Sequence, residues 1–94
     1  MARAIWKGQV VAETATPLHF DNNVYFPPDS LKPGFFTDSA HRSLCPWKGI
    51  ASYHTLVAEG EESPNAAWVY RDPLPAAEVI RDHVAFWKDV TVEP

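Results

Sequence analysis

Residues 45 to 58 read CPWKGIASYHTLVA, and the part from residue 50 onward decides which kind of fold the chain adopts. Its side chains alternate in character, with Ala51, Tyr53, Thr55 and Val57 on one side and Ser52 and His54 on the other. A period of two is the pattern of a β-strand, because successive side chains point to opposite faces of the sheet. The stretch therefore predicts a long strand over residues 50 to 58, ending at the turn residues Glu59 and Gly60.

A second β-prone segment follows this turn at residues 67 to 71, AWVYR. The same period of two places Trp68 and Tyr70 on one face of the predicted strand. If the two strands pair across the turn, Tyr53 comes to lie beside these rings, because paired side chains stand about 5 Å apart. We therefore expect a wall of aromatic rings on neighbouring strands.

The N-terminal half predicts two hairpins. Residues 3 to 6 and 9 to 13 flank Lys7-Gly8, and residues 18 to 20 and 24 to 26 flank Asp21-Asn22-Asn23. Glycine, asparagine and aspartate tolerate the left-handed backbone that such turns need. The prolines of FPPDSLKPG then remove backbone donors, which predicts a rigid loop with a capped turn.

The C-terminal part contains the only helix candidate. Ala76, Val79, Ile80 and His83 follow a helical period after Pro75, and VAFWKDVTV then returns to strand character. We predict a mainly β fold: a single folded-over antiparallel sheet, β-tent or barrel-like, with one short α-helix near residues 75–83. With 94 residues, 46% of them apolar, the chain is expected to form a single domain over residues 1–94.

Charge and cysteine content restrict the partners and the compartment. The net charge is −4 and the eight basic residues form no run, so we expect no nucleic acid partner. One cysteine makes no intramolecular disulfide and suits a reducing compartment. No stretch has the apolar length of a signal peptide or a membrane span, so we expect a cytoplasmic protein without a membrane partner.

Four segments resemble a known family and come in the family's order. They are YFPPDSL at 25–31, CPWKGIASY at 45–53, AAWVY at 66–70 and PAAEVIRDHVAFW at 75–87. They are similar to the small bacterial family called domain of unknown function 427. The resemblance implies a mostly β fold with one short helix, similar to the β-tent of translationally controlled tumour proteins and type B methionine sulfoxide reductases.

That family also has a nucleotidyltransferase-like label, which the residues do not support as a literal activity. Nucleotidyl transfer needs closely spaced metal-binding carboxylates and a loop that holds phosphates. The acidic residues are scattered or follow a turn, and only four glycines are present. Whether the chain is an enzyme at all is left open by the sequence.

Two groups of polar residues are weaker candidates for chemistry. Cys45 could act as a nucleophile if Lys48 or His41 lowered its pKa, but a lone cysteine more often packs as a small hydrophobe. His41 and Cys45 have a spacing seen in zinc sites, yet one thiolate falls short of the usual ligand sets, so we predict no metal and no cofactor. Ser52 and His54 lack a nucleophile elbow, and we expect them to form cross-strand hydrogen bonds.

The aromatic residues are the strongest functional candidates. We predict a binding surface made by Trp47, Lys48, Tyr53, Trp68 and Tyr70, with Cys45 shaping the loop and Ser30 facing the same cavity. Trp6, Phe86 and Trp87 are assigned to the core. An ammonium group beside aromatic rings suits a planar or anionic ligand.

The predicted function is therefore a binding module for a small polar, planar or anionic ligand. Two alternatives remain open at this stage. The first is a small enzyme that uses Cys45 or Lys48. The second is a homodimeric structural or protein-interaction domain that uses exposed aromatics or a free strand edge.

Overall fold

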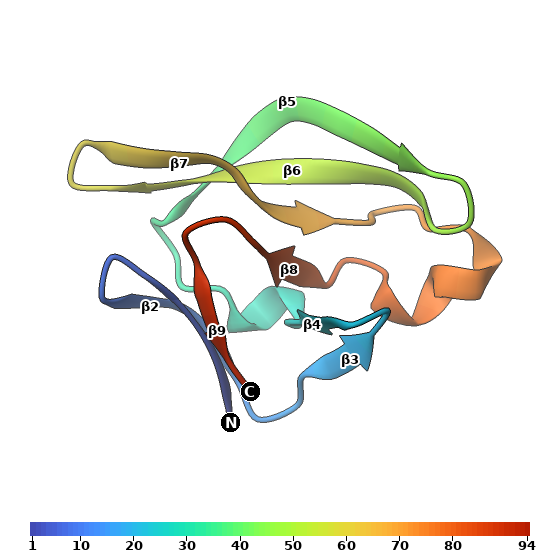
Figure 1. Ribbon diagram of the computed structural model, residues 1–94, viewed down its shortest axis with the longest axis horizontal. Helices are drawn as coiled ribbons and strands as arrows, with labels where there is room; N and C mark the ends of the chain where they lie inside the picture. The colour runs from blue at the N-terminus through green and yellow to red at the C-terminus, as the bar shows by residue number, and fades with distance from the viewer.

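The computed structural model describes all 94 residues, which form antiparallel strands arranged in three sheets (Figure 1). The largest sheet has the order β5 (Phe36–Cys45), β6 (Gly49–Ala58), β7 (Glu61–Val69) and β8 (Val84–Phe86). A second sheet contains β2 (Gln9–Thr14), β1 (Ala2–Trp6) and β9 (Thr91–Glu93), and a third pairs β3 (Leu18–Phe20) with β4 (Asn23–Tyr25). The predicted mainly β, antiparallel class is confirmed, although the chain forms three sheets that do not close into a barrel.

A single bridge connects the smallest sheet to the largest. Phe26 and Val84 exchange two backbone hydrogen bonds of 2.7 and 2.8 Å, one in each direction. The β3–β4 hairpin therefore continues the four-stranded sheet beyond β8, and in Figure 1 it folds back beneath that sheet. This arrangement accounts for the folded-over shape that the sequence predicts.

The turns that join the hairpins have the predicted backbone. Lys7 and Gly8 have φ angles of 52° and 75°, and Asp21 and Asn22 have φ angles of 51° and 63°. Both pairs lie in the left-handed region, which suits the right-handed twist of the strands that they connect. The two predicted N-terminal hairpins are thus confirmed, as is the long strand β6.

Strand β5 is absent from the sequence prediction. Its residues, FTDSAHRSLC, contain few β-branched side chains, and most of them are exposed because β5 lies at the edge of its sheet. The CPWKG segment is consequently a hairpin turn, in which Cys45 pairs with Gly49. Gly49 has a φ angle of 111°, and a Cβ atom there would lie 3.4 Å from the backbone nitrogen of Leu74.

The α-helix predicted near residues 75–83 is wrong in type and length. Residues Pro75–Ile80 form a 3₁₀ helix that is interrupted at Ala77, where φ is −117°. The chain must enter β8 at Val84, and Asp82 turns it there with a φ angle of 62°. The backbone hydrogen bonds of this segment join residues three apart, from Ala77 to Leu74 and from Arg81 to Glu78, as in a 3₁₀ helix. A second 3₁₀ turn, Pro28–Ser30, occupies the proline-rich loop.

Neighbouring positions of β7 contribute to two separate cores on opposite faces of the sheet. Ala67 and Val69 belong to a cluster of 12 buried residues, whereas Trp68 packs against a cluster of 6, to which Tyr70 belongs. The larger cluster includes Trp6, Val11, Phe26, Leu56, Val84 and Phe86, and the smaller one includes Tyr25, Ala51, Ala77, Ile80 and Ala85. No helix of the structure combines the length and the apolar character needed to cross a membrane.

Replacing Leu56 by alanine tests the larger core. Leu56 is fully buried, so Leu56→Ala should lower the free energy of unfolding by about 2–5 kcal/mol. Ile50 lies on the same strand but is 58% exposed, and Ile50→Ala should cost less than about 1 kcal/mol. Urea denaturation of both variants measures the difference, and equal losses would contradict this assignment of the core.

Candidate functional site

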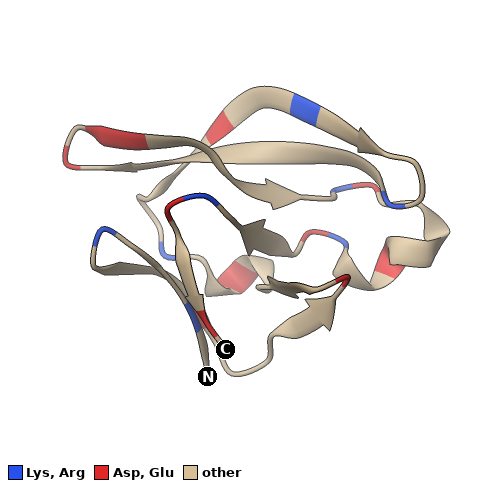
Figure 2. Ribbon diagram, viewed as in Figure 1, with Lys and Arg blue, Asp and Glu red and all other residues tan.

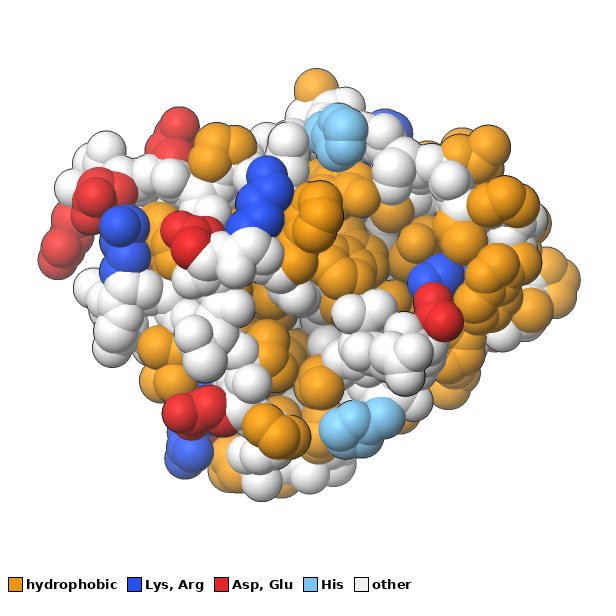
Figure 3. All heavy atoms as spheres, viewed as in Figure 1, with side chains coloured by type: hydrophobic (Ala, Val, Ile, Leu, Met, Phe, Trp, Pro, Cys, Tyr) orange, Lys and Arg blue, Asp and Glu red, His pale blue; other side chains and the backbone are white.

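Five side chains surround a hollow of about 160 Å³ on the face of the sheet that carries the smaller core. They are Lys48, Tyr53, Trp68, Tyr70 and Trp87. The β5–β6 turn, β6, β7 and the residue after β8 each supply part of the lining. In Figure 3 hydrophobic side chains gather across the middle of the face that is shown.

The register of the strands brings the rings together. Tyr53 on β6 lies directly opposite Trp68 on β7, as the sequence predicts. The indole rings of Trp68 and Trp87 stand nearly perpendicular, with centroids 6.0 Å apart and planes at 87°. The Tyr53 ring lies 6.5 Å from that of Trp87. The hollow is therefore bounded by aromatic faces in two nearly perpendicular directions.

Hydrogen bonds at the polar ends of these rings hold them in place. The Trp68 indole donates to the hydroxyl of Tyr25 at 3.3 Å, and the Trp87 indole donates to the backbone carbonyl of Asn65 at 2.5 Å. The Tyr53 hydroxyl is bonded to the hydroxyl of Ser43 at 2.9 Å. Because the polar groups are satisfied within the protein, the ring faces are left to meet a ligand.

The ammonium group of Lys48 is buried and already paired. Its Nζ forms an ion pair with Asp21 and lies 5.2 Å from the ring centroid of Trp47 and 5.8 Å from that of Tyr70. Burial alone would lower the pKa of Lys48, but the bond to Asp21 and the nearby phenols outweigh it and raise that pKa. Lys48 is therefore charged at neutral pH, and Asp21 balances the charge.

The phenols beside Lys48 stay protonated. Burial raises the pKa of Tyr70, and the Lys48 ammonium opposes this rise only in part. Burial likewise raises the pKa of Tyr25, against the hydrogen bond from Trp68 and the charge of Lys48. The polar side of the hollow thus presents a neutral hydroxyl and an ammonium that is part of an ion pair.

Four of the seven predicted site residues line this hollow, and three lie outside its lining. Trp47 is 45% exposed and packs against Phe20, with centroids 5.8 Å apart. Cys45 is half-buried at the end of β5, where it packs against the smaller core. Ser30 ends its own 3₁₀ turn, and its hydroxyl donates a hydrogen bond to the carbonyl of Pro27 at 2.6 Å. Trp47 and Ser30 were expected at the same cavity, and the structure places both outside its lining. Cys45 was expected to anchor the loop, and it packs against the smaller core.

Trp87 was assigned to the core, and this assignment is wrong. The side chain is 46% exposed and lines the hollow. The sequence pattern already indicated that Trp87 lies outside the core. Phe86 and Trp87 are adjacent in a strand-like segment, so their side chains cannot face the same side. Asp21 was interpreted only as a turn residue, and its pairing with Lys48, 27 positions away, depends on the tertiary fold.

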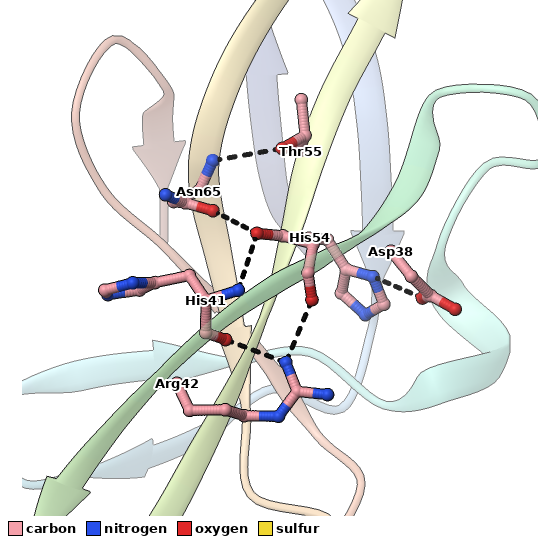
Figure 4. Close-up of polar contacts among 7 residues, drawn as sticks. Asp38, His41, Arg42, His54, Thr55 and Asn65 are labelled. Carbon is pink, nitrogen blue, oxygen red and sulfur yellow. Dashed lines mark hydrogen bonds and ion pairs between the residues drawn. The ribbon is translucent and has the colours of Figure 1, made fainter.

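A second polar group surrounds the place where β5 and β7 contain extra residues (Figure 4). The hydroxyl of Ser39 on β5 donates to the side-chain oxygen of Asn65 on β7, across β6, at 2.5 Å. The backbone nitrogen of Asn65 in turn donates to the hydroxyl of Thr55 at 3.3 Å. Asn65, whose backbone carbonyl holds Trp87, is thereby tied to both β5 and β6.

His54 lies in the same group and has little access to solvent. Its side chain is 12% exposed, and Nδ1 lies 3.4 Å from a carboxylate oxygen of Asp38 without the geometry of a hydrogen bond. The expected cross-strand hydrogen bonds of Ser52 and His54 are therefore not formed. No three His, Cys, Asp or Glu side chains lie close enough together to hold a metal ion, and the His41 ring packs instead against Tyr53 at 4.6 Å.

A larger hollow, of about 510 Å³, lies at the tip of the β6–β7 hairpin. Its lining includes Glu59, Glu61 and Glu62 but no aromatic ring, and Figure 2 shows the acidic residues gathered at this tip. The smaller hollow is the better candidate site, because it combines apolar rings with a few placed polar groups.

The lowered pKa of His54 predicts how folding stability depends on pH. Burial, together with the charge of Arg71, lowers the pKa of His54 against the opposing effect of Asp38. The unfolded chain therefore binds a proton at higher pH than the folded chain, and folding stability falls as the pH drops below about 6.5.

Urea denaturation between pH 5.5 and 7.5 measures this effect. The His54→Gln variant should lose stability less steeply than the wild type as the pH falls over this range. His19→Gln removes an exposed histidine and should leave the wild-type slope unchanged. Parallel profiles for wild type and His54→Gln would contradict the assignment.

Comparison with known proteins places the chain in a family. No curated protein matches the sequence at a significant level. The model of a family described as "Domain of unknown function (DUF427)", with the label NTP_transf_9, matches residues 1–93. Since the match covers nearly the whole chain, and since the fold is the mainly β one that the resemblance implies, the chain belongs to the DUF427 family.

Proposed function

We propose that the chain is a binding module for a small planar ligand with a polar, uncharged edge, held in the hollow that Trp68 and Trp87 border. The observation that carries this proposal is the convergence of four aromatic side chains and one ammonium on a single indentation. A planar ring stacks on one indole and meets the face of the other with its edge, and both are favourable aromatic geometries. The hydroxyl of Tyr70 and the Lys48 ammonium then contact the polar edge.

The volume of the hollow limits the size of the ligand. An apolar cavity of roughly 150 Å³ holds a molecule the size of benzene, whereas pockets for drug-sized ligands measure roughly 300–1,000 Å³. At about 160 Å³ the hollow suits a single ring, either a free molecule or the end of a longer one. A whole nucleotide is too large to be enclosed, so the family label does not describe what this site would bind.

The charge of the site favours a neutral ligand over an anionic one. Lys48 is the only charged side chain in the lining, and its ammonium is paired with Asp21. An anionic ligand would have to share the ammonium with the carboxylate of Asp21 or displace it. Among the polar, planar and anionic ligands that the sequence suggests, the planar neutral class is therefore the one that the geometry supports best.

Three fragments with the same ring test this proposal: benzamide, benzoate and benzamidine, with a neutral, an anionic and a cationic edge. In an NMR titration of ¹⁵N-labelled protein, benzamide should shift the signals of Tyr53, Trp68 and Trp87 in a saturable way and bind more tightly than the two ions. Trp68→Ala should abolish these shifts. Trp47→Ala removes an indole outside the hollow and should bind benzamide as the wild type does.

The proposal fails if benzamide leaves these signals unchanged, or if the two tryptophan variants respond alike. Heteronuclear spectra of the unliganded variants serve as the folding control. Trp68 is a partly buried residue that packs against the smaller core, so a dispersed spectrum of Trp68→Ala is required before its loss of binding is interpreted.

A substitution at Asp21 should change the preference for charge. Asp21→Asn keeps the left-handed turn, because asparagine tolerates the positive φ angle of this position, but it removes the charge that balances Lys48. We expect benzoate to bind this variant severalfold more tightly than the wild type, with benzamide nearly unchanged. Equal benzoate affinity in the two proteins would show that Asp21 does not control the ammonium.

A further inference from the structure

A separate hollow of about 290 Å³ lies among polar side chains of β5, β6 and the segment after β7. Its lining consists of Asp38, Ser39, Arg42, Ser52, Tyr53 and Arg71. Arg42 on β5 lies directly opposite Ser52 on β6. Ser52 and Tyr53 are adjacent in a strand, so Ser52 and Arg42 point to the face opposite the aromatic hollow.

The two arginines of this hollow differ from the other two in the chain. Arg3 is paired with Glu13, and Arg81 is paired with Glu78 and Asp72. Arg42 and Arg71 have no carboxylate partner, although acidic residues outnumber basic ones by 12 to 8 in the chain. The only two arginines without an acidic partner thus line the same indentation.

The guanidinium of Arg42 is held in a fixed position. Its Nη1 donates to the backbone carbonyls of Ser39 and His41, at 2.9 and 2.8 Å. These carbonyls belong to the extra residues of β5. Figure 4 shows the Arg42 guanidinium on the side of His54 and Asp38, whereas the His41 ring points the other way. The remaining N–H groups of Arg42 are left to donate to a ligand, as are those of Arg71 and the hydroxyl of Ser52.

We propose that this hollow binds a dianionic oxyanion of the phosphate or sulfate class, between the guanidinium groups of Arg42 and Arg71 and the hydroxyl of Ser52. Guanidinium groups match the geometry of such oxyanions, and two of them balance a double negative charge. Tyr53 borders both hollows, but the groups that would bind the oxyanion do not line the aromatic hollow, so this site does not depend on the function proposed for that hollow.

Asp38 sets the affinity of this site. Its carboxylate is in the lining and repels an anion, while the nearby His54 is mostly neutral at pH 7.5 because burial lowers the pKa of His54. We therefore expect weak binding in the wild type, and tighter binding once the charge of Asp38 is removed. This dependence separates a defined site from general attraction to basic residues.

The test is an NMR titration of the full chain with sodium sulfate at pH 7.5, at constant ionic strength, because sulfate keeps its double charge throughout. Saturable shifts should be confined to the amides of residues 38–42, 52 and 71. Arg71→Gln should weaken binding about tenfold or more, as expected when a charge-assisted hydrogen bond is lost. Asp38→Asn should strengthen it, and Lys32→Gln, which removes an exposed positive charge elsewhere, should leave it unchanged.

Sodium acetate provides the comparison of ligand classes, and it should bind more weakly than sulfate because it carries one charge. Three results would overturn the proposal. They are shifts spread over the whole surface, equal affinities of Arg71→Gln and Lys32→Gln, or acetate binding as tightly as sulfate. Asp38 and Arg71 are exposed, so their variants are expected to fold, and the dispersion of the unliganded spectra checks this.

Discussion

Alternation of side chains along β7 is the constraint on which the rest of the structure depends. One face of this strand supplies Ala67 and Val69 to the larger core, and the other presents Trp68 to the smaller core and to the hollow. A shift of register by one residue would exchange these faces and bury the indole where small residues now pack. The same pairing places Trp68 between Tyr53 and the small Ala85, which leaves space beside the ring.

The extra residues of β5 and β7 support both hollows. Ser39 and Asn65 bond across β6, and the Asn65 carbonyl accepts the hydrogen bond that holds Trp87 at the aromatic hollow. The same irregularity of β5 exposes the carbonyls that fix the guanidinium of Arg42. Irregularities of this kind redirect side chains locally without disturbing the pairing on either side. They explain how a chain of 94 residues forms two chemically different indentations.

The sequence predicts the parts of this structure that depend on local patterns. The period of two identifies β6 and places Tyr53 with Trp68, and turn chemistry at Lys7-Gly8 and Asp21-Asn22 identifies the hairpins. The sequence pattern fails for β5, which is an exposed edge strand without an apolar face. It also fails for the helix, because the 3₁₀ segment buries Ala77 and Ile80 and leaves Val79 of the predicted apolar face exposed. The sequence also does not predict the ion pair between Lys48 and Asp21, because no local pattern relates residues that are 27 positions apart.

The most direct test of the proposed function is where a planar fragment lies in the protein. Intermolecular nuclear Overhauser effects between benzamide and the side chains of the labelled protein measure this position. The account predicts contacts from the benzamide ring to the indole protons of both Trp68 and Trp87 and to the ring of Tyr53. Contacts confined to the exposed Trp47, or an absence of contacts at saturating benzamide, would contradict it.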